Sequence, residues 1–221
     1  ESTIVSSGSE EVTFSNSFIA LTINLGGGND VFTLESLDSG FSASLTINGD
    51  GGADTVTISG DIDVTGKAVE IHAETINVGS GVTISTEGTS SDGAIELIAE
   101  ASDAVSTSAL ISITGATIRG GDITIHAEST VTAADSSGSY AWIDVDSAAQ
   151  VLISGSTIAS SAALVIEALS TVNATAASQA DGSTGSTVDA AVAVVLVDST
   201  AIAGISGNST ISAAGAFTLS A

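Results

Sequence analysis

Two similar stretches in the first quarter of the chain, LTINLGGGNDVFTL (residues 21–34) and LTINGDGGADTVTI (residues 45–58), decide the expected fold. Equivalent residues lie 24 positions apart, as for Asp30 and Asp54. Each copy begins with alternating apolar and polar residues, which is the pattern of a strand with one buried face. A glycine-rich turn that ends in aspartate follows. Repetition at such an interval indicates a repeat architecture.

The repetition continues along the chain in a looser form. IHAE occurs at residues 71–74 and 125–128, with the related LIAE at 97–100. A third group comprises ISITGATI (111–118), LISGSTI (152–158) and ISGNSTI (205–211). Its members lie about 40 and 52 residues apart, an interval that we interpret as two coils each.

No segment has a convincing helical stripe, so the sequence predicts an all-β protein. The expected fold is a single-chain, right-handed parallel β-helix (β-solenoid) with about 20–26 residues per coil. One continuous solenoid is expected over residues 1–221, with acidic Gly-Asp-rich coils over 1–103 and Ala/Ser/Val-rich coils over 104–221. About nine coils would make a rod about 45 Å long.

An immunoglobulin-like sandwich is the competing all-β fold. Such domains use a bulky aromatic core and proline in their loops. This chain has one Trp, one Tyr, five Phe and no Pro, and its alanines suit a narrow core. These observations favour the solenoid.

The alternation also predicts which side chains point outward. In VEIHAE (69–74), Val69, Ile71 and Ala73 face the core, whereas Glu70, His72 and Glu74 face outward. In YAWIDVD (140–146), the outward residues are Tyr140, Trp142, Asp144 and Asp146. An outward aromatic pair beside carboxylates suggests a carbohydrate or subunit contact, and burial under a loop is the alternative. The expected loops are EGTSSDG (87–93), ADSSGS (134–139) and QADGSTGS (179–186).

The charge of the chain excludes several classes of partner. There are 26 acidic residues and two basic ones, Lys67 and Arg119, which give a formal charge of −24. Nucleic acid is not an expected partner, because phosphate binding needs a basic face. The longest apolar run, AAVAVVLV (190–197), is too short to insert into a membrane. Without Cys there is no disulfide and no thiolate metal site. Without Met, we expect Glu1 to follow processing or excision from a longer chain.

The glycine-rich turns are the candidate metal site. Stacking at a 24-residue interval brings Asp30 and Asp54 to one corner, next to Asp50. A hard cation such as Ca²⁺ takes six to eight oxygen ligands, so these carboxylates, with Asn48 as a weaker candidate, are the expected ligands. The alternative is structural: the glycines permit a positive φ and the aspartates cap the turns.

LGGGNDVFT (25–33) and GDGGADTVT (49–57) resemble the RTX nonapeptide G-G-x-G-x-D-x-U-x. The resemblance implies bound calcium and secretion. Leu25 and Asp50 replace glycines of the pattern, and the two copies are single rather than consecutive. These departures favour a wider solenoid with an RTX-like turn at one corner.

The expected function is that of an extracellular, cell-surface structural or adhesive protein, similar to large repetitive bacterial exoproteins. The chain would be a calcium-stabilised filament or sheath subunit, or a segment of a giant adhesin. Its partners would be copies of itself stacked head-to-tail, or flanking repeats of a longer chain. No catalytic role is expected, because Lys67 and Arg119 lie far apart in sequence and the many carboxylates single out no acid–base pair.

Other functions remain open. The repeated T-I-N at Thr22, Thr46 and Thr75 resembles the Thr-x-Asn ladder of calcium-bound, ice-binding solenoid regions in bacterial adhesins. An ice- or carbohydrate-binding solenoid is therefore the alternative function. A β-helix polysaccharide-degrading enzyme is the less favoured one.

Overall fold

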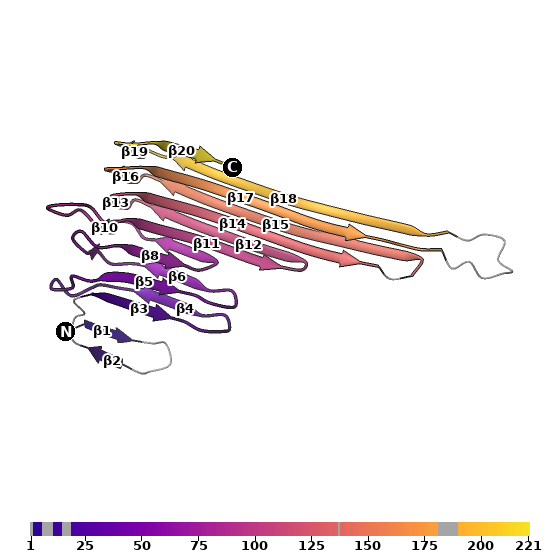
Figure 1. The fold of residues 1–221 in the computed structure, drawn as a ribbon, viewed down its shortest axis with the longest axis horizontal. Helices are drawn as coiled ribbons and strands as arrows, with labels where there is room; N and C mark the ends of the chain where they lie inside the picture. Colours follow the sequence, from indigo (N-terminus) through magenta and orange to yellow (C-terminus); the bar gives the residue numbers. More distant parts are fainter. Residues whose placement is uncertain (1, 6–10, 15–18, 137, 181–189) are drawn as a thin grey trace.

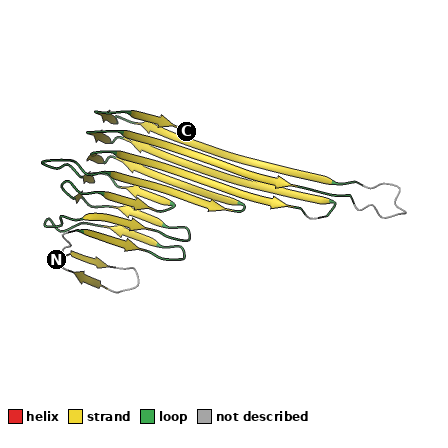
Figure 2. Cartoon of the chain, in the orientation of Figure 1, coloured by secondary structure: helices red, strands yellow, loops and turns green. Residues whose placement is uncertain are grey.

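The computed structural model of the chain describes residues 2–5, 11–14, 19–136, 138–180 and 190–221. These residues form strands joined by turns and loops, as Figure 2 shows. No helix occurs in the described ranges, and so none that is long and apolar enough to cross a membrane. The all-β prediction is confirmed.

Three parallel sheets make up the solenoid (Figure 1). The seven-stranded sheet contains β3 (Ala20–Asn24), β5 (Ser44–Asn48), β8 (Val69–His72), β11 (Ile95–Asp103), β14 (Ile123–Asp135), β17 (Leu164–Ala176) and β20 (Phe217–Ser220). The six-stranded sheet contains β4 (Val31–Leu34), β6 (Thr55–Ile58), β9 (Thr75–Val78), β12 (Ser106–Thr114), β15 (Tyr140–Ser154) and β18 (Val192–Ser206). The five-stranded sheet contains β7 (Ile62–Asp63), β10 (Thr83–Ser85), β13 (Thr117–Gly120), β16 (Thr157–Ser160) and β19 (Thr210–Ala213).

From β5 onward the chain visits the three sheets in turn, and throughout the solenoid each strand pairs in parallel with its equivalent in the next coil. This topology confirms the parallel β-helix. Two further strands, β1 (Ser2–Val5) and β2 (Glu11–Phe14), form a separate antiparallel pair before the first coil.

The core is a stack of small and branched apolar side chains. Val69, Ile71 and Ala73 are buried and their neighbours are not, as the alternation predicts. The same holds along β15, where Ala141 is buried and Trp142 is exposed. Isoleucines recur at equivalent positions, so the apolar stripe runs without a break from coil to coil. Burial of each such side chain stabilises the fold by about 1.5–3 kcal/mol.

Coil length is where the structure departs from the prediction. Seven residues of the seven-stranded sheet align from coil to coil: Leu21, Leu45, Val69, Ile95, Ile123, Leu164 and Phe217. Successive coils therefore repeat after 24, 24, 26, 28, 41 and 53 residues. The expectation of 20–26 residues fails for the last three. Six steps of about 4.8 Å give a stack of about 29 Å rather than 45 Å.

The long intervals in the second half are single coils. Ile113 pairs with Ile153, and Ile153 pairs with Ile205, so the 40- and 52-residue repeats are one coil each. Our interpretation of two coils per repeat is wrong, because the additional residues lengthen strands sideways instead of adding a coil.

These longer strands form a projection, which we call the wing (Figure 1). It consists of residues 132–135 and 173–176 of the seven-stranded sheet and 140–145 and 192–197 of the six-stranded sheet. The two layers pack over a second apolar cluster. Its members are Val131, Ile143 and Val145 with Ala133, Val172, Ala174 and Ala176.

A chain of hydroxyl groups lies where the wing meets the body. Ser147 Oγ lies 2.9 Å from Ser129 Oγ and accepts a hydrogen bond from Ser170 Oγ at 2.8 Å. Ser170 Oγ in turn lies 2.8 Å from Ser199 Oγ. The four serines alternate between the two sheets that form the wing, so this chain ties the layers together.

Candidate functional site

The two glycine-rich turns lie directly on each other, backbone against backbone. Gly28 N donates to Gly51 O at 2.7 Å, and Gly51 N donates to Gly26 O at 3.1 Å. Gly52 has a φ of 144°, and a Cβ there would collide with the carbonyl oxygen of Gly28. The glycines are therefore required by close stacking as well as by backbone conformation.

Beneath the turns, carboxylates of one coil cap backbone groups of the preceding coil. Asp30 N donates to Asp54 Oδ1 at 2.8 Å, and Asp54 N donates to Glu74 Oε2 at 2.7 Å. Asp54 is only 1% exposed. We call Asp30, Asp54 and Glu74 the inner carboxylate column. The aspartates therefore cap backbone N–H groups, as in the alternative without metal, but each carboxylate caps the neighbouring coil rather than its own turn.

Two oxygen atoms of this column have no hydrogen-bond partner. Asp30 Oδ2 and Asp54 Oδ2 are both buried and unpaired. Asp54 Oδ2 lies against Gly49, where a Cβ would be 2.6 Å away. A buried carboxylate oxygen without a partner is costly, because desolvation is not compensated. Hard oxygen donors in this position fit a calcium ion, which would supply the missing compensation.

The structure separates the four predicted ligands. Asp30 and Asp54 meet in the inner carboxylate column. Asn48 instead lies on the outward face of β5, where its Nδ2 donates to Asn24 Oδ1 at 2.8 Å. Asp50, with a φ of 69°, lines a groove on the outer side of the turn.

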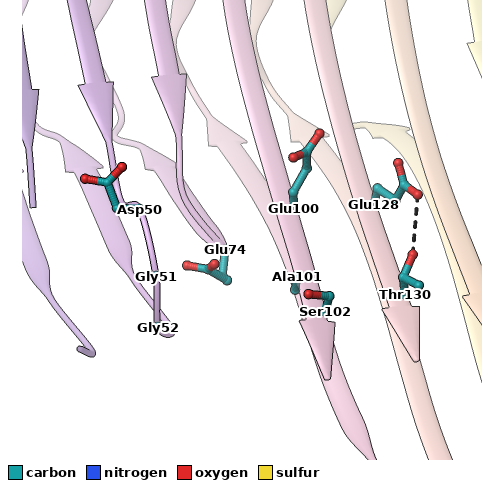
Figure 3. A pocket seen from close by; sticks show the side chains of 9 residues that line it. All are labelled: Asp50, Gly51, Gly52, Glu74, Glu100, Ala101, Ser102, Glu128 and Thr130. Carbon is teal, nitrogen blue, oxygen red and sulfur yellow. Dashed lines mark hydrogen bonds between the residues drawn. The ribbon is translucent and has the colours of Figure 1, made fainter. Parts of the chain in front are cut away.

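This groove, which we call the acidic groove, carries four carboxylates from four consecutive coils: Asp50, Glu74, Glu100 and Glu128 (Figure 3). Glu100 and Glu128 are register partners on β11 and β14. Thr130 donates to Glu128 Oε1 at 3.4 Å. Neither Lys67 nor Arg119 lines the groove. The arrangement creates a strip of negative potential that attracts cations.

Sequence reasoning missed the three glutamates. The signal was present, since IHAE, LIAE and IHAE end at residues 74, 100 and 128. Glu74 belongs to both the acidic groove and the inner carboxylate column, because it lines the groove and accepts the backbone N–H of Asp54. The groove and the inner carboxylate column are therefore adjacent parts of one acidic corner.

No group of three or more His, Cys, Asp or Glu side chains within the described ranges is arranged to hold a metal ion. A cation at Asp30 and Asp54 would therefore need backbone carbonyl oxygens or water as its other ligands. The calcium site remains a prediction.

Two other outward patterns are reorganised by the fold. Thr22 pairs with Thr46 on the seven-stranded sheet, but Thr75 lies on β9 in the six-stranded sheet. The T-I-N repeat thus makes two adjacent rungs rather than three. His72 and His126 are separated by Ile98, which pairs with both, so they lie two rungs apart.

In comparisons with known proteins, no protein-family model matches the chain, and no curated protein or solved structure is significantly similar to it.

Proposed function

We propose that the chain is an extracellular structural or adhesive element, a solenoid rod whose coils are held together with the help of calcium. The observation that carries this proposal is the pair of buried, unpaired oxygens at Asp30 and Asp54. They lie at the contact between two coils, where a bound cation would act directly on coil-to-coil cohesion.

Asp30 and Asp54 would hold the ion, and the carbonyl-rich turns supply oxygen atoms of the type that calcium prefers. The ion would neutralise charge that neither Lys67 nor Arg119 compensates, since no basic residue lines the adjacent groove. Asp50 and Glu74 would add long-range attraction. Because they line the acidic groove beside Asp30 and Asp54, their negative charge would raise the local concentration of cations and exclude anions.

At the cell surface, the ends of the solenoid would stack on further solenoid coils. Coil size favours flanking repeats over head-to-tail stacking of copies. The first coils repeat after 24 residues and the last after 53, so the two ends differ in cross-section. The wing of one copy would have no counterpart on the first coil of another. A non-catalytic, mechanical role is consistent with the repeated ladders of the three sheets.

Thermal unfolding followed by circular dichroism tests the calcium role. Wild-type chain is stripped with EDTA and then measured with CaCl₂, MgCl₂, or NaCl at equal ionic strength. Calcium at about a hundredfold excess over its Kd should stabilise the fold by about 2.7 kcal/mol. Magnesium and sodium should have a smaller effect. An unfolding temperature that is equal in EDTA and calcium overturns the proposal.

A further inference from the structure

The outward face of the wing on the six-stranded sheet is an apolar patch. Tyr140 and Trp142 are 55% and 45% exposed, and Val192 and Leu196 of the neighbouring strand are 48% and 45% exposed. Tyr140 pairs with Val192, and Trp142 pairs with Val194, so these side chains form one contiguous surface. We call these five residues the wing patch. Tyr and Trp side chains, which have an apolar body and a polar tip, are enriched at interaction sites.

The aromatic pair is the centre of this patch. Its ring centroids are 6.4 Å apart and the ring planes differ by only 17°. These are the only Trp and the only Tyr of the chain. The backbone at Trp142 is fixed, since its N–H donates to the carboxylate of Asp135 at 2.8 Å. The platform is therefore held on a strand rather than on a loop.

Carboxylates border the wing patch on the side of the body. Asp144 pairs with Leu196, and Asp146 pairs with Asp198 in the next row. All three aspartates are exposed. Lys67 and Arg119 lie outside the wing, before β8 and on β13. The site thus offers an apolar platform and hydrogen-bond acceptors with negative charge.

The wing patch would stay exposed even if a further strand paired with the edge of β18. A strand added at that edge would lie in the plane of the sheet, whereas these side chains project perpendicular to it. The platform would stay accessible in a longer stack.

The size of the patch selects the kind of ligand. From Tyr140 to Asp146 the wing patch and its acidic border are together about 20 Å long and, over two strands, about 10 Å wide, or about 200 Å². A stable protein interface buries about 800 Å² per partner. The patch is too small for that but sufficient for a short stretch of sugar chain, whose apolar C–H faces stack on aromatic rings.

We propose that the wing patch binds a glycan that carries amino sugars. Pyranose rings would stack on Tyr140 and Trp142, and the protonated amino groups would pair with the bordering aspartates. Charge complementarity sets this choice. A chain of charge −24 repels anionic glycans, and neutral glycans gain no ionic contact from the rim. This site is independent of the calcium proposal.

Because Trp142 is the only tryptophan, its fluorescence reports binding at this site alone. The probes are hexamers of glucosamine, N-acetylglucosamine and glucose, together with a hyaluronan hexamer. Glucosamine hexamer should change the emission and bind at least about tenfold more tightly than the neutral hexamers, and binding should weaken with salt. Hyaluronan should not bind. No change with glucosamine hexamer overturns the proposal.

The affinities of variants, measured by calorimetry, distinguish binding at the wing patch from general attraction by net charge. Tyr140→Ala and Trp142→Ala should each lower affinity about tenfold or more. The double variant Asp144→Asn/Asp146→Asn should bind more weakly and show a smaller salt dependence, since Asp198 remains at the border. Leu152→Ala, an exposed apolar residue of β15 outside the patch, is the matched control and should bind as wild type.

Equal affinity of Tyr140→Ala and wild type would show attraction by net charge only and overturn the proposal. So would a lysine-rich peptide that binds as tightly as the glucosamine hexamer. Circular dichroism of each variant confirms that it is folded. Repeating the titration in EDTA keeps the outcome separate from the calcium proposal, because the wing patch needs no metal.

Discussion

Asp54 receives the backbone N–H of Asp30 on its Oδ1 at 2.8 Å, while the Oδ2 of each of these residues is buried without a partner. The carboxylate therefore makes one strong contact and leaves part of its charge uncompensated. Without metal, Asp54→Asn keeps an acceptor for Asp30 N–H and removes the buried charge. We expect this variant to be more stable than wild type in EDTA, by about 1 kcal/mol, and to lose the calcium response. Denaturant unfolding with and without calcium measures both effects.

Asp63→Asn is the control for this experiment, because Asp63 is exposed on the same coil. It should respond to calcium as wild type does. If Asp54→Asn is destabilised equally in EDTA and in calcium, the carboxylate serves only as a cap and the metal role is wrong.

Close stacking of the turns makes Gly52 sensitive to substitution. Its φ of 144° and the carbonyl oxygen of Gly28 leave no room for a methyl group. Gly52→Ala should destabilise the fold by more than about 2 kcal/mol. Gly51→Ala is the matched control, because a Cβ at Gly51 meets nothing within 4 Å. Urea unfolding compares the two variants, and equal stabilities would contradict the stacking argument.

The serine chain should stabilise the junction between body and wing. Ser147 is buried and bonded to both Ser129 and Ser170. Ser147→Ala removes one hydrogen-bond partner each from Ser129 and Ser170, which keep other partners, at a cost of about 0.5–1.5 kcal/mol. Ser108→Ala, at an exposed position on β12, should change stability by less than about 0.5 kcal/mol. Chemical denaturation of the two variants gives the comparison.

The fold could be predicted from local patterns because each coil repeats the same requirements. Alternation identified the buried residues of 69–74 and 140–146, and the repeats placed Thr117, Thr157 and Thr210 in equivalent positions. Coil length could not be predicted. An alternating run of Ala, Ser and Val has the same pattern whether it turns a corner or continues straight, so the wing was counted as additional coils.

The site was predictable only in part. The spacing of the glycine-rich turns brought Asp30 and Asp54 together as expected. The alternation of LTIN also predicted that Asn48 faces outward, away from this pair. The spacing did not show that Asp50 lines the neighbouring acidic groove instead of joining the inner carboxylate column. The glutamates of the acidic groove recur at intervals of 26 and 28 residues, which a search for one fixed period overlooks.

The wing should open more readily than the body. Its own apolar cluster has three buried members, packed with partly buried alanines and Val172, whereas the main core is continuous from coil to coil. Local opening free energies follow such differences in packing. We expect the amides of Ile143 and Val145 to exchange with solvent faster than those of Ile111 and Ile113. Hydrogen exchange followed by NMR measures this, and equal protection would mean that wing and body unfold as one unit.

Asp92 gives a prediction for pH dependence. The hydroxyl of Ser161 and the backbone N–H of Gly88 both donate to its carboxylate and lower its pKa below the ordinary value of 3.8. A lowered pKa in the folded state means that the charged form is favoured by folding. Its stabilising contribution is therefore present above the ordinary value and is lost as the pH falls through the lower, folded value.

Ser161→Ala removes the larger cause and should raise the pKa of Asp92 towards its ordinary value, as measured by NMR titration of the side-chain carboxyl carbon. Unfolding at neutral pH should show the variant to be slightly less stable than wild type. The difference should disappear in strong acid, where Asp92 is protonated in both. Ser212→Ala, at an exposed position on β19, should leave the Asp92 titration unchanged. A variant that titrates as wild type would show that Ser161 does not stabilise this carboxylate.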